Sequence, residues 1–211
     1  MDISEKNGLQ SAFYFKTACT DPVYDDDYSI DHPYIRQLMR DINERGHEIG
    51  LHPSYLTYND PVQTRREYER LRKACEEENI QQNAWGGRQH YLRWQVPMTW
   101  RNWAHAGLNY DSTLSYADHA GFRCGVCYEY PVYDLKQRKQ LPLTERPLIV
   151  MEGSVLGEPY MNLSGQEAYG CMHKLKQRCR MFNGDFTLLW HNSSFDTRQM
   201  WEMYENMIAK R

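Results

Sequence analysis

Short apolar runs alternate with longer amphipathic stretches along most of this chain. The runs predict strands at 11–15, 47–52, 84–90, 110–116, 148–151 and 186–191. Apolar residues at helical spacing predict helices after Asp31, from Pro61 to about Asn79, between Pro97 and Gly107, from Ser164 to about Met181, and from about Thr197 to Ala209. Because strands and helices alternate, the pattern is typical of βα units and a mainly parallel sheet.

The first predicted helix has clear start and stop residues. Asp31 is the predicted N-cap, Pro33 lies in the first turn, and Gly46 follows the last turn in the C′ position. We therefore expect the strand over 47–52, with the sequence HEIGLH, to begin directly after this helix.

Length and composition favour one globular domain spanning 1–211. Hydrophobic residues make up 41% of the chain and charged residues 25%, with no repeat or linker, which excludes a fibre or a disordered tail. No apolar stretch approaches the ~18 residues of a membrane span. The first residues, MDISEK, form no secretory signal, which favours a cytoplasmic location. A net charge of −3 argues against nucleic acid as a partner.

Aromatic residues with a polar group are unusually frequent. The chain has 16 Tyr and 6 Trp against 6 Phe, and such rings suit wet clefts where sugars stack, although they also suit the edge of an ordinary core. Six cysteines in a chain without a signal peptide are expected to be reduced thiols. Cys124 and Cys127 form one C-x-x-C pair, which leaves open a structural zinc or redox protein.

Chemistry in parallel α/β folds collects at the carboxyl ends of the strands. The residues that end the predicted strands are His52, Arg88 with His90, Asp111, Glu152 and His191. His191 suits a general acid because an imidazole titrates near neutral pH, while a structural, hydrogen-bonded histidine is the alternative. Asp111 falls where a strand buries its side chains, so this carboxylate needs an arginine or histidine partner.

Two further segments carry polar groups after predicted strands. The segment RQHYLRW, from Arg88 to Trp94, combines arginines that can bind a carboxylate with aromatics that can hold a sugar face, or it is a polar surface strand. Asp25 to Asp27 form an acidic loop that either contributes to a metal or substrate site or is simply solvated.

In this order, the strand-end residues resemble the polysaccharide deacetylase family, which has the NodB-homology fold. GHEIGLH at 46–52 resembles the family's second motif, RQHY at 88–91 the third, and LWH at 189–191 the fifth, while YDST at 110–113 lies where the fourth is expected. The longer strings RQHYLRW, YDSTLSYAD and LLWHNSSF resemble a bacterial subgroup associated with surface-polysaccharide biosynthesis.

The resemblance implies an irregular (β/α) barrel and a metal-dependent hydrolase that removes acetyl groups from sugars. A divalent metal, often zinc, polarises the acetyl carbonyl in this family. Carried over by position, His52 is a metal ligand, His191 the acid, Arg88 the group that orients the catalytic carboxylate, and Asp111 the support for the histidine. The carbohydrate substrate is expected to contact Tyr55, Tyr91, Arg93 and Trp190.

Three departures from the family pattern leave activity open. Leu56 stands where the second ligand histidine is expected, and His90 replaces a proline, so His90 is a candidate for the missing nitrogen ligand. The paired-aspartate first motif is absent upstream of the strand at 11–15, which predicts a barrel without its first strand and an exposed edge suited to a homo-oligomer. The alternative function is therefore a catalytically inactive protein that binds carbohydrate or a partner.

Overall fold

The computed structural model describes residues 1–25 and 28–209, which group into two compact units. Unit 1 contains Met1 and residues 9–113 and 130–145, and unit 2 contains residues 2–8, 114–129 and the chain from Arg146 onward. The prediction of one domain over 1–211 stays a prediction.

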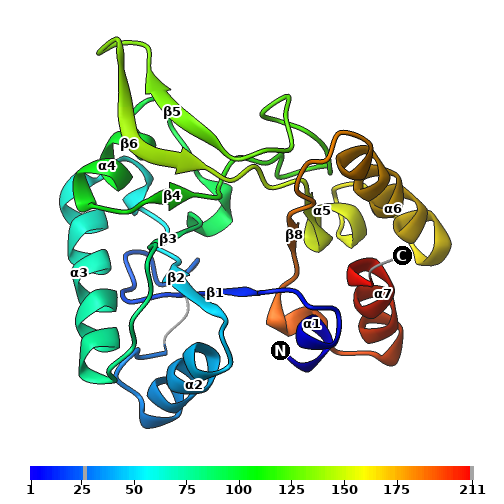
Figure 1. Ribbon diagram of the computed structural model, residues 1–211, viewed down its shortest axis with the longest axis horizontal. Helices are drawn as coiled ribbons and strands as arrows, with labels where there is room; N and C mark the ends of the chain where they lie inside the picture. The colour runs from blue at the N-terminus through cyan, green and yellow to red at the C-terminus, as the bar shows by residue number, and fades with distance from the viewer. Residues whose placement is uncertain (26–27, 210–211) are drawn as a thin grey trace. The chain divides into compact units, whose positions relative to one another are not determined.

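Unit 1 is built on a six-stranded sheet (Figure 1). In spatial order its strands are β1 (Ala12–Phe15), β2 (Glu48–Leu51), β3 (Gly86–Gly87), β4 (Tyr110–Asp111), β6 (Lys139–Glu145) and β5 (Tyr130–Asp134). The neighbouring pairs β1–β2, β2–β3, β3–β4 and β4–β6 are parallel, and β5 is antiparallel to β6. The predicted α/β class with a mainly parallel sheet is confirmed. Among the described residues the sheet does not close into a barrel, because β1 and β5 form its two edges.

Three helices pack against this sheet through a shared hydrophobic core. They are α2 (Pro33–Glu44), α3 (Pro61–Glu77) and α4 (Met98–Ala106). Asp60 caps α3 by accepting hydrogen bonds from the backbone N–H groups of the first turn, and Gly107 ends α4 with a φ of 90°.

The predicted N-cap of α2 is wrong by one residue. His32 is the cap, and its side chain accepts the backbone N–H of Tyr34. The Asp31 carboxylate instead pairs with Arg36 at 2.6 Å and with Arg70 at 2.9 Å. Two arginines outcompete the weaker backbone donor for the same carboxylate.

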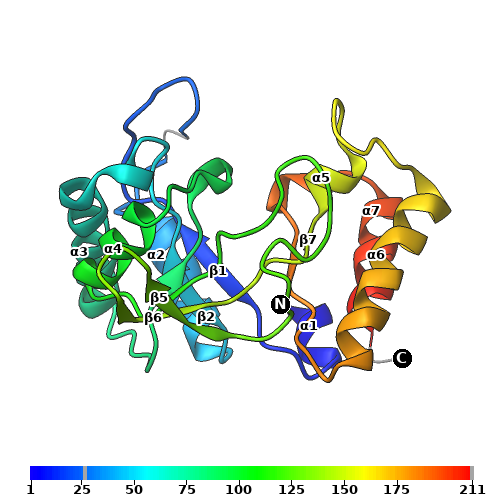
Figure 2. The ribbon, with the colours of Figure 1, turned by 90° about the horizontal axis from the view of Figure 1, so that it is seen from above.

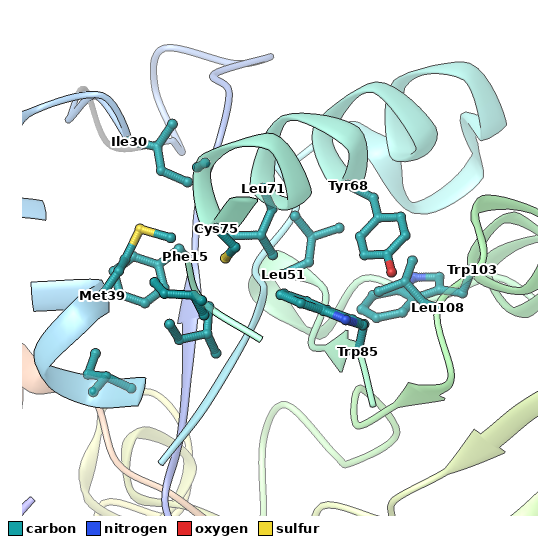
Figure 3. Close-up of a cluster of buried hydrophobic side chains, with 14 of the residues drawn as sticks. Phe15, Ile30, Met39, Leu51, Tyr68, Leu71, Cys75, Trp85, Trp103 and Leu108 are labelled. Carbon is teal, nitrogen blue, oxygen red and sulfur yellow. The ribbon is translucent and has the colours of Figure 1, made fainter. Parts of the chain in front are cut away.

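Alternate residues of β1 and β2 fill the core beneath these helices. Leu71 and Cys75 of α3 point toward Phe15 and Leu51, which end β1 and β2 (Figure 3). Leu51, Leu71 and Cys75 are fully buried, so the one face of each strand that meets the helices carries the apolar side chains.

Glycine permits the close approach of two central strands. An added Cβ at Gly87 would collide with the carbonyl oxygen of Leu51, which is backbone of the paired strand. No side chain fits there, so the tight spacing of β2 and β3 depends on glycine.

Unit 2 is mainly helical, with one small parallel sheet. Its elements are α1 (Asp2–Lys6), β7 (Val150–Met151), α5 (Glu152–Leu156), α6 (Gly165–Met181), β8 (Leu188–Leu189) and α7 (Arg198–Ile208), and β7 pairs with β8. Helices α6 and α7 lie side by side in both views (Figures 1 and 2). Met172 and Met207 are fully buried between the elements of this unit.

The strands are shorter than predicted, and the β5–β6 hairpin was not predicted. Asp111 ends β4 early because its side chain accepts the backbone N–H of Thr113, an Asx turn that diverts the chain. After β3, Tyr91 and Leu92 adopt positive φ values of 56° and 52°, which no strand accommodates. Within residues 1–25 and 28–209, every helix is too short or too polar to cross a bilayer.

Candidate functional site

The parallel strands of unit 1 deliver several polar side chains to one edge of the sheet. Backbone hydrogen bonds continue the ladder past the strand ends, from the N–H of His52 to Phe15 and from the N–H of Arg88 to Leu51. The residues that follow the strands are Lys16, His52, Arg88, His90 and Ser112. Because neighbouring parallel strands end at the same edge, residues distant in sequence become neighbours here.

His52 and His90 form a pair of imidazoles at this edge. Their ring centroids are 4.9 Å apart, with the planes inclined by 66°. The Nδ1 atom of His52 lies 2.7 Å from the carbonyl oxygen of Arg88, so Nδ1–H donates and Nε2 carries the lone pair. Burial, followed by the proximity of His90, holds the pKa of His52 well below its usual range. His52 is therefore a neutral imidazole at pH 7, the form that binds a metal.

Asp25 is the carboxylate that contacts this pair. Its Oδ1 atom lies 3.0 Å from Nδ1 of His90, and its side chain is fully buried. Asp26 and Asp27, the rest of the predicted acidic loop, lie outside the described residues.

Backbone donors occupy the remaining capacity of the Asp25 carboxylate. The N–H groups of Thr20, Asp21 and Tyr55 donate to it at 2.8, 3.0 and 2.9 Å. Burial opposes ionisation, but the hydrogen bonds from Thr20, Asp21, Tyr55 and His90 outweigh it, and the pKa of Asp25 lies below its usual range. The ionised carboxylate of Asp25 therefore connects three loop segments through hydrogen bonds and orients the ring of His90.

The chemistry of two of these residues suits zinc. Imidazole nitrogens suit Zn²⁺, and the hydrogen bond on Nδ1 of His52 is the kind that orients a metal-bound histidine. Across residues 1–25 and 28–209, however, no group of three His, Cys, Asp or Glu side chains has the geometry to hold a metal ion. The structure supplies two imidazoles without a third protein ligand among its described residues.

Arg88 and Asp111 lie buried at the ends of β3 and β4. The Arg88 guanidinium donates to the Ser112 carbonyl at 2.7 Å and to the Ser112 hydroxyl at 2.8 Å, and it lies 5.2 Å from the ring of Tyr14. Asp111 accepts the backbone N–H of Thr113 at 3.0 Å. Its second oxygen, Oδ2, has no hydrogen-bond partner among the described residues. Burial raises the pKa of Asp111 to about 7, against the lowering effect of Thr113 and Arg88.

Unit 2 holds the histidine predicted as the acid. His191 follows β8, and its Nδ1 lies 2.6 Å from Oε1 of Glu152, which follows β7. The same oxygen accepts the His191 backbone N–H at 2.9 Å and the Ser194 hydroxyl at 2.8 Å. Within unit 2, Glu152 is therefore a carboxylate that contacts His191. The role of Asp111 as the support for the histidine stays a prediction.

Aromatic side chains surround both groups. In unit 1, the Arg93 guanidinium lies 4.0 Å from the ring centroids of Tyr55 and Tyr58 and donates to the Tyr55 carbonyl at 2.8 Å. Tyr91 is 59% exposed, with its ring centroid 4.6 Å from that of His90. In unit 2, Trp190 packs against Phe195 and Tyr204. Tyr55, Tyr91 and Arg93 are thus brought together around His90.

Sequence reasoning assigned no role to Lys16 and Glu152. Lys16 directly follows β1, is 5% exposed, and has its Nζ 4.0 Å from Oδ1 of Asp25. Each residue directly follows a strand, so the strand-end rule could have found Lys16 as well. Glu152 was singled out by that rule, but nothing in the sequence indicates that His191 is its partner.

The cysteines of the C-x-x-C pair have different surroundings. Cys127 is buried and its thiol is hydrogen-bonded with Cys179 of α6, while Cys124 is half-buried. Burial, followed by the proximity of Cys127, raises the pKa of Cys179 to about 12, so this thiol is protonated at neutral pH. The structural zinc or redox hypothesis stays a prediction.

Comparison with solved structures finds a crystal structure described as a "putative polysaccharide deacetylase" from Mycobacterium smegmatis. The TM-score is 0.65 at 20% sequence identity, over 98% of this chain and 67% of the other. The chain has a polysaccharide deacetylase-like fold. It spans about two thirds of the length of that relative. No protein-family model and no curated protein matches the sequence.

Proposed function

We propose that this chain is a deacetylase that hydrolyses acetyl groups on a sugar or polysaccharide precursor in surface-polysaccharide biosynthesis. The observation that carries the proposal is the pair of imidazoles, His52 and His90, at the carboxyl end of a parallel sheet. The Nδ1 atom of each is tied to an oxygen acceptor, Arg88 for His52 and Asp25 for His90. The likeness to a fold described as a deacetylase supports the same class.

The proposed cofactor is a divalent metal, zinc by the nature of its ligands. His52 and His90 are the proposed ligands, with the remaining positions filled from outside the described protein residues. When bound, such a metal polarises a carbonyl and lowers the pKa of a coordinated water. The protein's own part is to keep His52 neutral through burial and to fix both rings through their Nδ1 hydrogen bonds.

Proton transfer to the leaving group is assigned to His191. Glu152 fixes the His191 tautomer by accepting from Nδ1, so Nε2 is the nitrogen that exchanges a proton with substrate. Arg88 and Asp111 shape the buried end of the strands in unit 1. The proposed contacts for the carbohydrate are Tyr55, Tyr91, Arg93 and Trp190. A cytoplasmic location and self-association are parts of the same proposal.

Metal content and acetate release test the proposal together. Protein purified without added metal is measured by elemental analysis beside His52→Ala, with His105→Ala, an exposed histidine of α4, as the matched control. We expect about one zinc per chain in the parent and in His105→Ala, and loss of the metal in His52→Ala. Acetate release from N-acetylated and O-acetylated sugar oligomers should disappear in His52→Ala and His191→Ala.

A second candidate function is non-catalytic carbohydrate binding. It is favoured by one observation, the lack of a third metal-ligating side chain among the described residues. Sugar binding without metal, in a protein that releases no acetate even after dialysis against zinc, would select this candidate and reject the deacetylase.

A further inference from the structure

Three tyrosines from separate segments of unit 1 form an aromatic corner. The rings of Tyr24 and Tyr55 stack with centroids 4.3 Å apart and planes inclined by 21°. The ring of Tyr91 stands nearly perpendicular to both, 5.5 Å from Tyr24 and 5.4 Å from Tyr55, at 81° and 88°. We use the name aromatic corner for Tyr24, Tyr55 and Tyr91 together.

The corner remains open to solvent at a cost in backbone strain. Tyr24 is 43% exposed and Tyr91 is 59% exposed, although their rings contact one another. Tyr91 has φ 56° and ψ 21°, and Leu92 follows with φ 52°. A non-glycine residue in this region costs about 1 kcal/mol or more, and such strain concentrates at ligand sites. Leu92 is buried, but Tyr91 gains little burial in return, so packing alone does not account for its position.

The three described rings of the corner present aromatic faces and phenol groups. Arg93, a cation next to the corner, lies 4.0 Å from the ring centroids of both Tyr55 and Tyr58, and it donates to the carbonyl of Tyr55. Its charge is therefore already engaged by the protein. Flat apolar faces bordered by groups that both donate and accept hydrogen bonds match an uncharged pyranose ring, which has C–H faces and a rim of hydroxyls.

The position of the corner connects it to the histidine pair. The centroid of Tyr91 is 4.6 Å from that of His90, and the centroid of Tyr55 is 6.4 Å from it. Asp25, which follows Tyr24 directly, also holds the backbone of Tyr55 and the ring of His90. One buried carboxylate thus fixes the loop of Tyr24, the loop of Tyr55 and the imidazole in a single arrangement.

We propose that the aromatic corner is a subsite for an uncharged pyranose ring of the substrate, with Tyr24 as its outer stacking face. The inference rests on the proposed function for the identity of the substrate, and it adds Tyr24 as a residue that determines substrate affinity. It predicts that removing the ring of Tyr24 raises KM and leaves kcat unchanged, because the ring contacts the sugar and not the acetyl group.

Binding of a trisaccharide of β-1,4-linked N-acetylglucosamine, measured by calorimetry, tests the subsite without requiring turnover. Tyr24→Ala should bind at least about tenfold more weakly, whereas Tyr24→Phe, which keeps the ring, should stay within about threefold of the parent. Tyr133→Ala removes a tyrosine of comparable exposure, 50% against 43% for Tyr24, from β5 and serves as the matched control, with unchanged binding.

Tyr91→Gly provides an independent variant that relieves the backbone strain while removing the second ring. Glycine adopts positive φ without penalty, so this variant should fold. Its affinity for the trisaccharide should nevertheless be at least about tenfold weaker than that of the parent. Unchanged affinity in Tyr24→Ala or Tyr91→Gly, or absence of trisaccharide binding by the parent protein, would overturn the inference.

The same measurements separate this inference from the proposed function. Weakened binding in Tyr24→Ala, in a protein that releases no acetate, would keep the subsite and reject the deacetylase. Acetate release with an unchanged KM in Tyr24→Ala would keep the deacetylase and reject the subsite.

Discussion

Replacing Glu152 with glutamine should destabilise unit 2, because it removes a buried charge while keeping the shape of the side chain. The Glu152 side chain is 2% exposed, and its Oε1 atom accepts three hydrogen bonds. The donors are the backbone N–H of His191, its ring Nδ1, and the hydroxyl of Ser194, at 2.9, 2.6 and 2.8 Å. Glutamine can still offer one oxygen to these donors, so the perturbation isolates the charge.

The size of the effect follows from the strength of hydrogen bonds to charged groups. Such bonds contribute about 1.5–3 kcal/mol each, against about 0.5–1.5 kcal/mol for neutral ones, a difference of about 1 kcal/mol per bond. The His191 side chain is 48% exposed, so solvent screens its share. We therefore expect Glu152→Gln to lower the free energy of unfolding by about 2 kcal/mol at pH 7.5.

The pH dependence of this difference is the sharper test. Burial raises the pKa of Glu152, but the hydrogen bonds from His191 and Ser194 outweigh it, so the folded-state pKa lies below its usual value. A carboxyl group with a lowered pKa stabilises the fold above its unfolded-state pKa and loses that contribution as the pH falls through the folded value. The gap between the parent and Glu152→Gln should therefore close as the pH falls from 7.5 to 3.

Guanidinium chloride denaturation followed by circular dichroism measures both quantities. Glu158→Gln is the control, because Glu158 is exposed and bonded only to the Asn162 side chain among the described contacts, so it should change stability by less than about 0.5 kcal/mol. A destabilisation in Glu152→Gln that is equally large at pH 7.5 and pH 3 would refute the role assigned to the charge.

Three further predictions concern unit 1 and a helix of unit 2. Gly87→Ala should lower the free energy of unfolding by at least about 3 kcal/mol or prevent folding, because the added Cβ meets the Leu51 carbonyl oxygen. Gly170→Ala in α6, where the added Cβ has no atom within contact distance, should raise it by about 1 kcal/mol, and thermal melts of both variants check this. Asp111→Asn should gain stability relative to the parent as the pH rises from 4 to 7. The reason is that the raised folded-state pKa of Asp111 makes the parent lose about 1.4 kcal/mol of unfolding free energy for each pH unit of increase. Urea titrations in which the two unfolding free energies differ by the same amount at every pH would contradict it. Asp25→Asn should lose about 3 kcal/mol at pH 7, with the loss fading in acid, as measured by calorimetric melting from pH 7 to pH 3.

The elements with strong local determinants were predictable from the sequence. Helix α3 begins where Asp60 and Pro61 predict, and α4 ends at Gly107, because capping and φ preferences act within a few residues. The β5–β6 hairpin was missed, since its strands mix apolar with charged residues and each includes a proline. The two-residue pairing of β4 depends on an Asx turn, which competes with strand propensity through one side-chain bond.

The sequence predicts which residues belong to the candidate site but not which of them contact one another. His52 and Arg88 were expected at strand ends, and the parallel register brings both to one edge. Which acceptor holds each histidine depends on loop paths that no local pattern encodes. Asp25 lies 65 residues from His90, and Glu152 lies 39 residues from His191.

The pairs Asp25–His90 and Glu152–His191 both place a buried carboxylate against Nδ1 of a histidine, but the two histidines differ in exposure. In each, a buried carboxylate that accepts at least one backbone N–H also accepts from Nδ1, which fixes the tautomer and directs Nε2 away from the carboxylate. The His90 side chain is 14% exposed, whereas the His191 side chain is 48% exposed. A shielded imidazole suits a ligand that must stay in one place, and an exposed one suits a group that exchanges protons with substrate or water. The difference in exposure between His90 and His191 therefore supports the proposed roles, metal ligand for His90 and acid for His191, although Nδ1 of each contacts a buried carboxylate.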